Sequence, residues 1–265
     1  MVSIKWTGGR TGNDLFQYIF SRLLAIKNNL HLETEWPHQD FVEMHPFVGG
    51  EKHDKPVVEV RDMYHDPHEK EWFSTSLAKK HLITHGFFQH PKYYDKNKRL
   101  VKSFFNLKPI QKRPPEHIVI HWRLGDYYKV GNTRCENCIK QSCYGCRGGS
   151  VINPSWYAGV LMQKLRFNLK KHKLYIVTDD PGDPILTKLQ RFKPEIISKS
   201  PKHDFHFIRD FDTIICGNSS FSFWASYLSD AKRIYTFSRW VNEPHNYIIR
   251  LAYFHNAMPV NGQWL

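Results

Sequence analysis

Apolar residues recur along this chain with two different spacings, and the change of spacing marks out the predicted elements. Val2–Trp6 alternates weakly and predicts a short strand, which the glycine-rich loop Thr7–Gly12 follows. Over Asp14–Lys27 the apolar positions have the i, i+3, i+4, i+7 spacing of a helix that packs on a sheet. A strand, a glycine loop and a helix in this order are a typical opening of an α/β domain.

The next part of the chain is less regular. Its predicted elements are two strands and then a helix, at Pro56–Val60, Lys80–Phe88 and Tyr93–Phe105. Lys108–Pro115 holds three prolines and has no periodicity, which predicts a linker between domains. We therefore expect an N-terminal α/β domain over residues 1–112 and a second domain over residues 113–265.

Beyond the linker, predicted strands and helices alternate. The strands are His117–His121, Leu174–Val177, Glu195–Ser198, Thr213–Cys216 and Arg233–Phe237. The helices are Pro154–Leu169, Pro184–Phe192, Phe205–Phe211, Phe221–Leu228 and a C-terminal helix, Glu243–Phe254. This succession predicts a parallel sheet with helices on both faces.

The composition fits a folded protein with an anionic partner. Hydrophobic residues make up 41% of the chain, and the formal charge is +13. Such a charge favours an anionic binding partner, which could be a nucleic acid, a membrane surface or a phosphorylated substrate. The basic residues are dispersed and form no recognised nucleic-acid-binding module, so we expect a nucleotide-using enzyme and no nucleic-acid partner. Peripheral association with an anionic membrane through the basic surface stays open.

The N-terminus lacks the pattern of a secretory signal, and no stretch is apolar for long enough to span a membrane. The expectation is a cytoplasmic protein. The sequence predicts no particular oligomeric state.

The most informative stretch is Ile118–Tyr128, where an apolar run ends in His121, Arg123 and Asp126. A buried parallel strand delivers polar groups in this way to its carboxyl end, where open α/β sheets bind ligands. The guanidinium of Arg123 offers a fixed fork of donors that suits a phosphate. The simpler alternative is a strand end with surface charges.

Three other junctions have polar residues of the same kind. Asp179 and Asp180 follow a predicted strand and could accept hydrogen bonds from guanine or ribose, or one of them could cap the helix near Pro184. Ser219, Ser220 and Ser222, together with Phe221, lie between a strand and a helix, as in a phosphate cradle, although serine caps are common. Arg10, Gly12, Asn13 and Asp14 lie at the first glycine loop, where either an anion site or a plain helix cap explains them.

Four cysteines, Cys135, Cys138, Cys143 and Cys146, form two Cys-x-x-Cys pairs separated by four residues. Four thiolates this close favour one structural Zn²⁺ in an insertion over residues 131–150, with disulfides, free thiols or an iron–sulfur cluster as alternatives. Cys216 closes an apolar strand and is expected to be a core thiol. The Asp-x-Asp at Asp210–Asp212 follows no apolar strand, so we interpret it as a coincidence rather than a metal motif.

The ordered set of motifs resembles the α-1,2-fucosyltransferase family (glycosyltransferase family 11) and, more loosely, other GDP-fucose-using transferases. The residues that carry the resemblance are Gly9–Tyr18, Gly86–Gln89 with Lys92–Tyr94, His121–Tyr127, Thr178–Pro181 and Asn218–Trp224. The resemblance implies an α/β, GT-B-like architecture of two Rossmann-like lobes with parallel sheets and an interlobe cleft. It also implies inverting transfer of L-fucose from GDP-β-L-fucose to a hydroxyl of a glycan or glycolipid acceptor, without a catalytic metal.

Carried over to this sequence, the resemblance implies a role for each motif. Arg123 would hold the diphosphate, His121 would lie near the nucleotide, and Asp180, or less surely Asp179, would read guanine. The segment Ser219–Ser222 would line the phosphates and ribose. Arg10, Gly12 and Asn13 would approach the sugar from the other lobe. Asp14, Asp126 and the departing phosphate are all candidates for the general base.

This chain also departs from the family pattern. Leu124 occupies a position where family members usually carry a second arginine, Asp14 replaces a glutamine, and the Cys₄ loop is additional. The departures leave the donor sugar and the acceptor open. The alternatives are a transferase for another nucleotide sugar, a basic zinc-containing nucleic-acid-binding protein, and a degenerate transferase retained as a binding scaffold.

Overall fold

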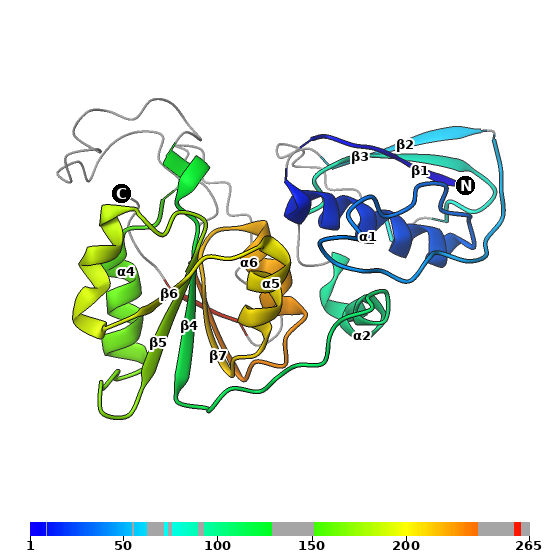
Figure 1. The fold of residues 1–265 in the computed structure, drawn as a ribbon. Helices are drawn as coiled ribbons and strands as arrows, with labels where there is room; N and C mark the ends of the chain where they lie inside the picture. The colour runs from blue at the N-terminus through cyan, green and yellow to red at the C-terminus, as the bar shows by residue number, and fades with distance from the viewer. Residues whose placement is uncertain are drawn as a thin grey trace. The chain divides into compact units, whose positions relative to one another are not determined.

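The computed structural model describes residues 1–8, 10–54, 56–62, 72–73, 76–89, 93–128, 151–237 and the backbone of 257–260. The chain divides into two compact units, Met1–Lys108 and Pro109–Leu265. Each unit contains a parallel sheet and helices (Figure 1). The α/β class predicted from the sequence is confirmed. None of the described helices is both long and apolar enough to cross a membrane.

The first unit contains a three-stranded parallel sheet in the order β1-β3-β2. Its elements are β1 (Val2–Lys5), α1 (Thr11–Asn28), β2 (Val57–Asp62), β3 (His81–Gly86), the 3₁₀ helix η2 (Asp95–Asn97) and α2 (Lys98–Lys102). Helix α1 packs on the sheet through buried residues at helical spacing, among them Leu15, Phe16, Ile19, Phe20 and Leu23.

The two ends of helix α1 differ in how well the local sequence accounts for them. It ends where Asn29 takes a left-handed conformation (φ 53°) and donates its N–H to the carbonyl of Ile26. It begins at Thr11 with Arg10 as the N-cap residue, so Asn13 and Asp14 lie in the first turn. The alternative that Asn13 or Asp14 caps this helix is therefore wrong.

The helix predicted over Tyr93–Phe105 is much shorter than expected. Only η2 and the five residues of α2 are helical there. The ring of Tyr93 packs against Phe20, and the Tyr94 hydroxyl donates to the carbonyl of Phe88. Burial of these aromatic side chains against α1 and the end of β3 competes with a continuous helix.

The second unit contains a six-stranded parallel sheet in the order β6-β5-β4-β7-β8-β9. The strands are β4 (His117–Trp122), β5 (Lys173–Thr178), β6 (Glu195–Ile197), β7 (Thr213–Cys216), β8 (Arg233–Phe237) and β9 (Ala257–Val260). The helical segments are η3 (Gly125–Tyr128), α4 (Pro154–Gly159), the π-helix η4 (Val160–Lys164), the 3₁₀ helix η5 (Pro184–Phe192), α5 (Pro201–Arg209) and α6 (Ser220–Tyr227).

This strand order is that of a doubly wound, Rossmann-like sheet. Numbered by their sequence within the unit, the strands run 3-2-1-4-5-6, and the direction of winding reverses between β4 and β7. Open α/β sheets bind ligands beyond the carboxyl ends of their strands at such a reversal. The order therefore singles out the residues that follow β4 and β7.

Alternate residues of β4 face opposite sides of the sheet. Ile118, Ile120 and Trp122 share one hydrophobic core with Trp156 and Tyr157 of α4. The ring of His121 instead stacks on Phe221 of α6, on the other face. Figure 1 shows α4 on one side of the sheet and α5 and α6 on the other. This is the two-faced packing that the alternation of strands and helices predicted.

In the second unit one predicted helix is shorter than expected, and one strand was not predicted. The helix expected over Pro154–Leu169 ends as an α-helix at Gly159 and continues as the π-helix η4 only to Lys164. Strand β9 was not predicted, because it is only four residues long and contains Pro259, a residue type that is unfavourable inside a strand. The predicted C-terminal helix Glu243–Phe254 lies outside the described residues.

Candidate functional site

Arg123 follows β4 directly, and its guanidinium is fixed by two carboxylates. Nε lies 2.9 Å from Oδ1 of Asp126 and 3.0 Å from Oδ2 of Asp179. The ring of Tyr127 lies beneath the guanidinium carbon, 5.4 Å from its centroid. Within the described part of the chain, neither terminal nitrogen of Arg123 is hydrogen-bonded. Nε of Arg123 thus holds the side chain in position. The two terminal nitrogens remain available for a bidentate contact with a phosphate.

Asp179 joins the carboxyl end of β5 to the loop after β4. Its Oδ1 accepts the backbone N–H of Leu124 at 2.8 Å, while Oδ2 pairs with Arg123. Gly125 makes this approach possible, because a Cβ there would lie 2.8 Å from Oδ2 of Asp179. Asp179 therefore orients the loop and its arginine.

Asp180, the next residue, has a different environment. The helical segment after it is capped by Asp183, whose side chain accepts the N–H of Ile185 at 2.9 Å, so the alternative that Asp180 caps this segment is wrong. Among the described residues, the Asp180 carboxylate accepts no hydrogen bond and forms no ion pair. It is a half-buried acceptor at a strand end, available to a donor such as a guanine or a ribose hydroxyl.

His121 connects β4 to α6 on the buried side of this region. Its Nδ1 is hydrogen-bonded to the hydroxyl of Ser222, and its ring stacks on Phe221 with centroids 5.0 Å apart. Burial lowers the pKa of His121 to about 4, partly opposed by the nearby charge of Asp179. The imidazole is therefore neutral near pH 7 and positions α6 without adding charge.

The start of α6 lies beside the loop that follows β4. Ser219 is the N-cap residue, and its hydroxyl accepts the N–H of Phe221 at 3.2 Å. The Tyr127 hydroxyl donates to the carbonyl of Asn218 at 2.9 Å, which joins η3 to the turn before α6. Burial raises the pKa of Tyr127 to about 12, partly opposed by Arg123, so this hydroxyl stays protonated and can donate.

Gly217 lies directly after β7 and contacts the end of β4. Its N–H donates to the carbonyl of His121 at 2.9 Å. A Cβ at this position would lie 2.8 Å from that carbonyl oxygen and 3.2 Å from the hydroxyl of Tyr157. The junction therefore has no room for a side chain.

Leu124, the residue after Arg123, belongs to the core of the second unit. Its side chain is fully buried in the hydrophobic core that contains Trp122 and Val151. A second arginine at this position would place its charge in an apolar core. At the end of β4, Arg123 is thus the cation that the chain directs toward the site.

In the first unit, Asp14 forms a carboxylate–imidazole pair with His38. Oδ2 of Asp14 lies 2.9 Å from Nε2 of His38, and their side chains are 14% and 35% exposed. Burial raises the pKa of Asp14, and the hydrogen bond to His38 opposes that shift. Asp14 fixes the tautomer of the imidazole with its proton on Nε2, so Nδ1 keeps the lone pair that can accept a proton.

The other polar residues near the start of α1 brace the glycine loop. The Asn13 side chain accepts a hydrogen bond from Nε2 of buried Gln89 at 2.9 Å. Oε1 of Gln17 accepts the backbone N–H of Thr7 at 2.9 Å. Arg10 is exposed, and Gly12 is buried in the first turn of the helix.

The predicted zinc ligands Cys135, Cys138, Cys143 and Cys146 lie outside the described residues. In the part that is described, no three His, Cys, Asp or Glu side chains gather as a metal site would require. Cys216 is buried, as expected of a core thiol, and burial raises its pKa to about 12. Asp212 pairs with Lys112 and Lys232 at the amino-terminal edge of the sheet, so this carboxylate has a structural role.

The charged residues of this region are recognisable in the sequence, but several neutral residues that connect them are not. In the second unit the structure brings together Arg123, Asp126, Asp179, His121, Ser219 and Ser222. Gly217, Asn218 and Tyr127, which complete the contacts between them, were not selected as site residues, although they lie within or directly beside the motifs that the sequence shows. His38 gave no signal, because it belongs to an irregular stretch. No family profile and no curated protein matches this chain.

Proposed function

We propose that this protein is a GT-B-like glycosyltransferase, and specifically an inverting fucosyltransferase that moves L-fucose from GDP-β-L-fucose to a glycan hydroxyl. The observation that carries this proposal is the guanidinium of Arg123. It is clamped by Asp126 and Asp179 beside the reversal of the sheet, and its terminal nitrogens have no partner among the described residues. In this proposal the two units are the two lobes of the transferase.

In the proposed reaction, Arg123 binds the diphosphate and stabilises the charge that develops as GDP leaves. A prepositioned cation is effective in this role because it needs little reorganisation during the reaction. The first turn of α6, capped by Ser219, supports the same assignment, because helix N-termini bind anionic groups. Asp180, with its available carboxylate, is assigned to the guanine base.

The Asp14–His38 pair is the general base in this proposal. Asp126, the other carboxylate considered for this role, already neutralises Arg123. Nδ1 of His38 would take the proton of the acceptor hydroxyl as its oxygen attacks the anomeric carbon of the donor, and GDP departs with the bonding electrons. Asp14 would stabilise the imidazolium that results.

Two rival functions predict different ligands. A transferase for another nucleotide sugar would bind that nucleotide in place of GDP. A basic nucleic-acid-binding protein would bind an oligonucleotide, and its affinity would fall steeply with salt. The predicted zinc fits either rival and does not distinguish them.

Thermal-shift measurements against GDP, GDP-fucose, UDP and a DNA oligonucleotide separate these functions, because a ligand that binds the folded state raises the melting point. We expect shifts with GDP and GDP-fucose that Arg123→Ala abolishes and Lys188→Ala, an exposed control, retains. A shift with DNA alone would reject the enzyme proposal, and a shift with UDP alone would reject the fucosyl donor. Release of GDP from GDP-fucose in the presence of glycan acceptors then tests the transfer itself.

A further inference from the structure

A hollow of about 520 Å³ opens at the amino-terminal edge of the second unit's sheet, opposite the candidate site. Its lining residues come from the segments that precede β4 and β5, from the first residue of β8 and from the loop after η4. They are Pro115, Glu116, Leu165, Arg166, Asn168, Lys171, His172 and Arg233. The volume lies within the range of small-molecule sites.

The charge of this hollow is unbalanced. Arg166, Lys171 and Arg233 contribute three formal positive charges, and Glu116 is the one carboxylate in the lining, which leaves a formal excess of two. No ion pair is formed by any of the three cations with another residue that the structure describes. Nearby lysines at the same edge differ, since Lys173 pairs with Glu195 and Lys232 pairs with Asp212.

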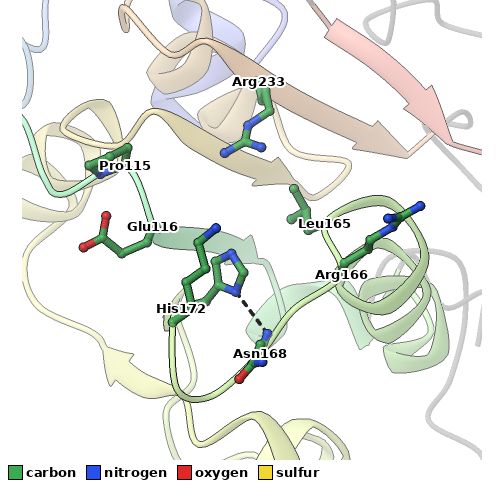
Figure 2. Close-up of a pocket in the computed structure, with 8 residues that line it drawn as sticks. Pro115, Glu116, Leu165, Arg166, Asn168, His172 and Arg233 are labelled. Atoms are coloured by element: carbon green, nitrogen blue, oxygen red, sulfur yellow. Dashed lines mark hydrogen bonds between the residues drawn. The ribbon is translucent and has the colours of Figure 1, made fainter.

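Part of the lining is held in place before any ligand arrives. The N–H of Asn168 donates to Nδ1 of His172 at 3.0 Å, and the His172 ring stacks on Phe167 with centroids 5.4 Å apart. Because Nδ1 accepts a hydrogen bond, the remaining ring nitrogen, Nε2, carries the proton and can donate. Figure 2 shows His172 and Arg233 on opposite sides of the hollow, while the guanidinium of Arg166 points away from its centre.

We propose that this hollow binds a phosphate monoester with a body the size of a sugar. Without Arg166, whose guanidinium points away, Lys171 and Arg233 still offer two cations to a monoester, which carries about −1.5 to −2 at pH 7. The guanidinium of Arg233 can grip the phosphate in a bidentate contact, and Lys171 and His172 supply further N–H donors. Glu116 and the Asn168 amide can hold hydroxyl groups, and Leu165 offers an apolar surface to the ring.

The chemistry of the hollow favours this ligand over inorganic phosphate. A single tetrahedral anion would leave much of the volume, and both Glu116 and Leu165, without a contact. An uncharged sugar would leave the cations without a counter-charge. The ligand therefore needs both a phosphate and a polyhydroxylated body.

Calorimetric titration of the full chain with glucose 1-phosphate, glucose and inorganic phosphate tests the proposal. We expect glucose 1-phosphate to bind most tightly and glucose not to bind. Arg233→Ala should weaken binding by about tenfold or more, as loss of a charge-assisted hydrogen bond implies. Lys171→Ala should weaken binding as well. Arg99→Ala and Lys188→Ala, which remove exposed cations elsewhere, should have no effect.

The candidate nucleotide site is the competing location for a phosphate, and Arg123→Ala distinguishes the two. Binding of glucose 1-phosphate that survives Arg123→Ala and is lost in Arg233→Ala supports the hollow as the site. Binding lost in Arg123→Ala but kept in Arg233→Ala would overturn the proposal, as would the absence of binding at millimolar concentration. Melting curves of the variants establish that each is folded.

Discussion

Oδ2 of Asp179 lies 3.0 Å from Nε of Arg123, so the end of β5 orients the arginine that follows β4. The other oxygen of Asp179 holds the N–H of Leu124. One carboxylate thus fixes both the side chain and the backbone of this loop. Asp180, its neighbour in sequence, shares neither contact.

Substitution of these two aspartates should separate positioning from binding. Asp179→Ala removes the acceptor of a half-buried N–H and a partner of Arg123, so we expect a loss of about 1–3 kcal/mol in the free energy of unfolding. Asp179→Asn keeps an acceptor for Leu124 and should lose less. Asp180→Ala should change stability by less than about 0.5 kcal/mol and weaken GDP binding. Denaturant unfolding and GDP titration measure the two effects, and equal stability losses at both positions would contradict the assignment.

Acid should destabilise the fold through His121. Its pKa is about 4 in the folded protein, because of burial, and 6.5 is the ordinary value. Between these values the unfolded chain binds a proton that the folded chain does not, so stability is complete above pH 6.5 and falls as the pH drops toward 4. The loss amounts to about 3 kcal/mol.

The variant His121→Gln removes this titration and should flatten the pH dependence of the unfolding free energy over the same interval. His45→Gln, which changes an exposed histidine, serves as the control and should keep the wild-type slope. Urea unfolding between pH 4 and pH 7 makes the comparison. A slope that persists in His121→Gln would show that other groups cause it.

Two glycine substitutions should have opposite effects. Gly217→Ala places a Cβ 2.8 Å from the carbonyl oxygen of His121, a backbone atom that cannot rotate away. We expect a loss of about 1–3 kcal/mol in stability, together with weaker nucleotide binding. Gly159→Ala meets no atom within 4 Å in helix α4 and should stabilise the protein by about 0.5–1 kcal/mol. Thermal unfolding of both variants checks the contrast, and a neutral Gly217→Ala would argue against a closely packed junction.

The proposed role of His38 as the general base can be tested by the rate of transfer. His38→Gln should lower the rate constant of transfer by about 10²–10⁴-fold while leaving GDP affinity unchanged, because the loss of a general base affects the chemical step. Asp14→Asn should keep the hydrogen bond to Nε2 but weaken the base and shift the pH profile of the rate. Steady-state kinetics across pH, with GDP titration as the control, test both variants. An unchanged rate in His38→Gln would place the base elsewhere.

The accuracy of the sequence-based bounds differs between elements, and the reason is visible in particular residues. The strands Thr213–Cys216 and Arg233–Phe237 have the predicted bounds. A short apolar run between polar turns, buried on both faces, is typical of a strand in a parallel sheet, so its secondary structure is easy to predict. Tyr93–Phe105 has apolar residues at helical spacing, but its aromatic rings are buried by tertiary packing that the local pattern does not reveal.

The candidate site was predictable in its charged residues and not in its contacts. His121 and Ser222 are hydrogen-bonded across 101 residues of sequence. Their contact depends on the placement of β7 beside β4, and the order of strands in a sheet is not encoded in any single stretch. The Asp14–His38 pair was missed because His38 reaches α1 from an irregular segment, whose contacts no local pattern predicts.

The placement of β7 beside β4 also has a consequence for how the chain acquires its native state during synthesis. Ile118 of β4 pairs with Thr213 of β7, so the hydrogen bonds on this side of β4 cannot form until Thr213 has left the ribosome. Distant pairings of this kind slow folding. A nascent chain that ends before Thr213 would expose one side of its central strand, which makes early termination products of this protein candidates for chaperone binding.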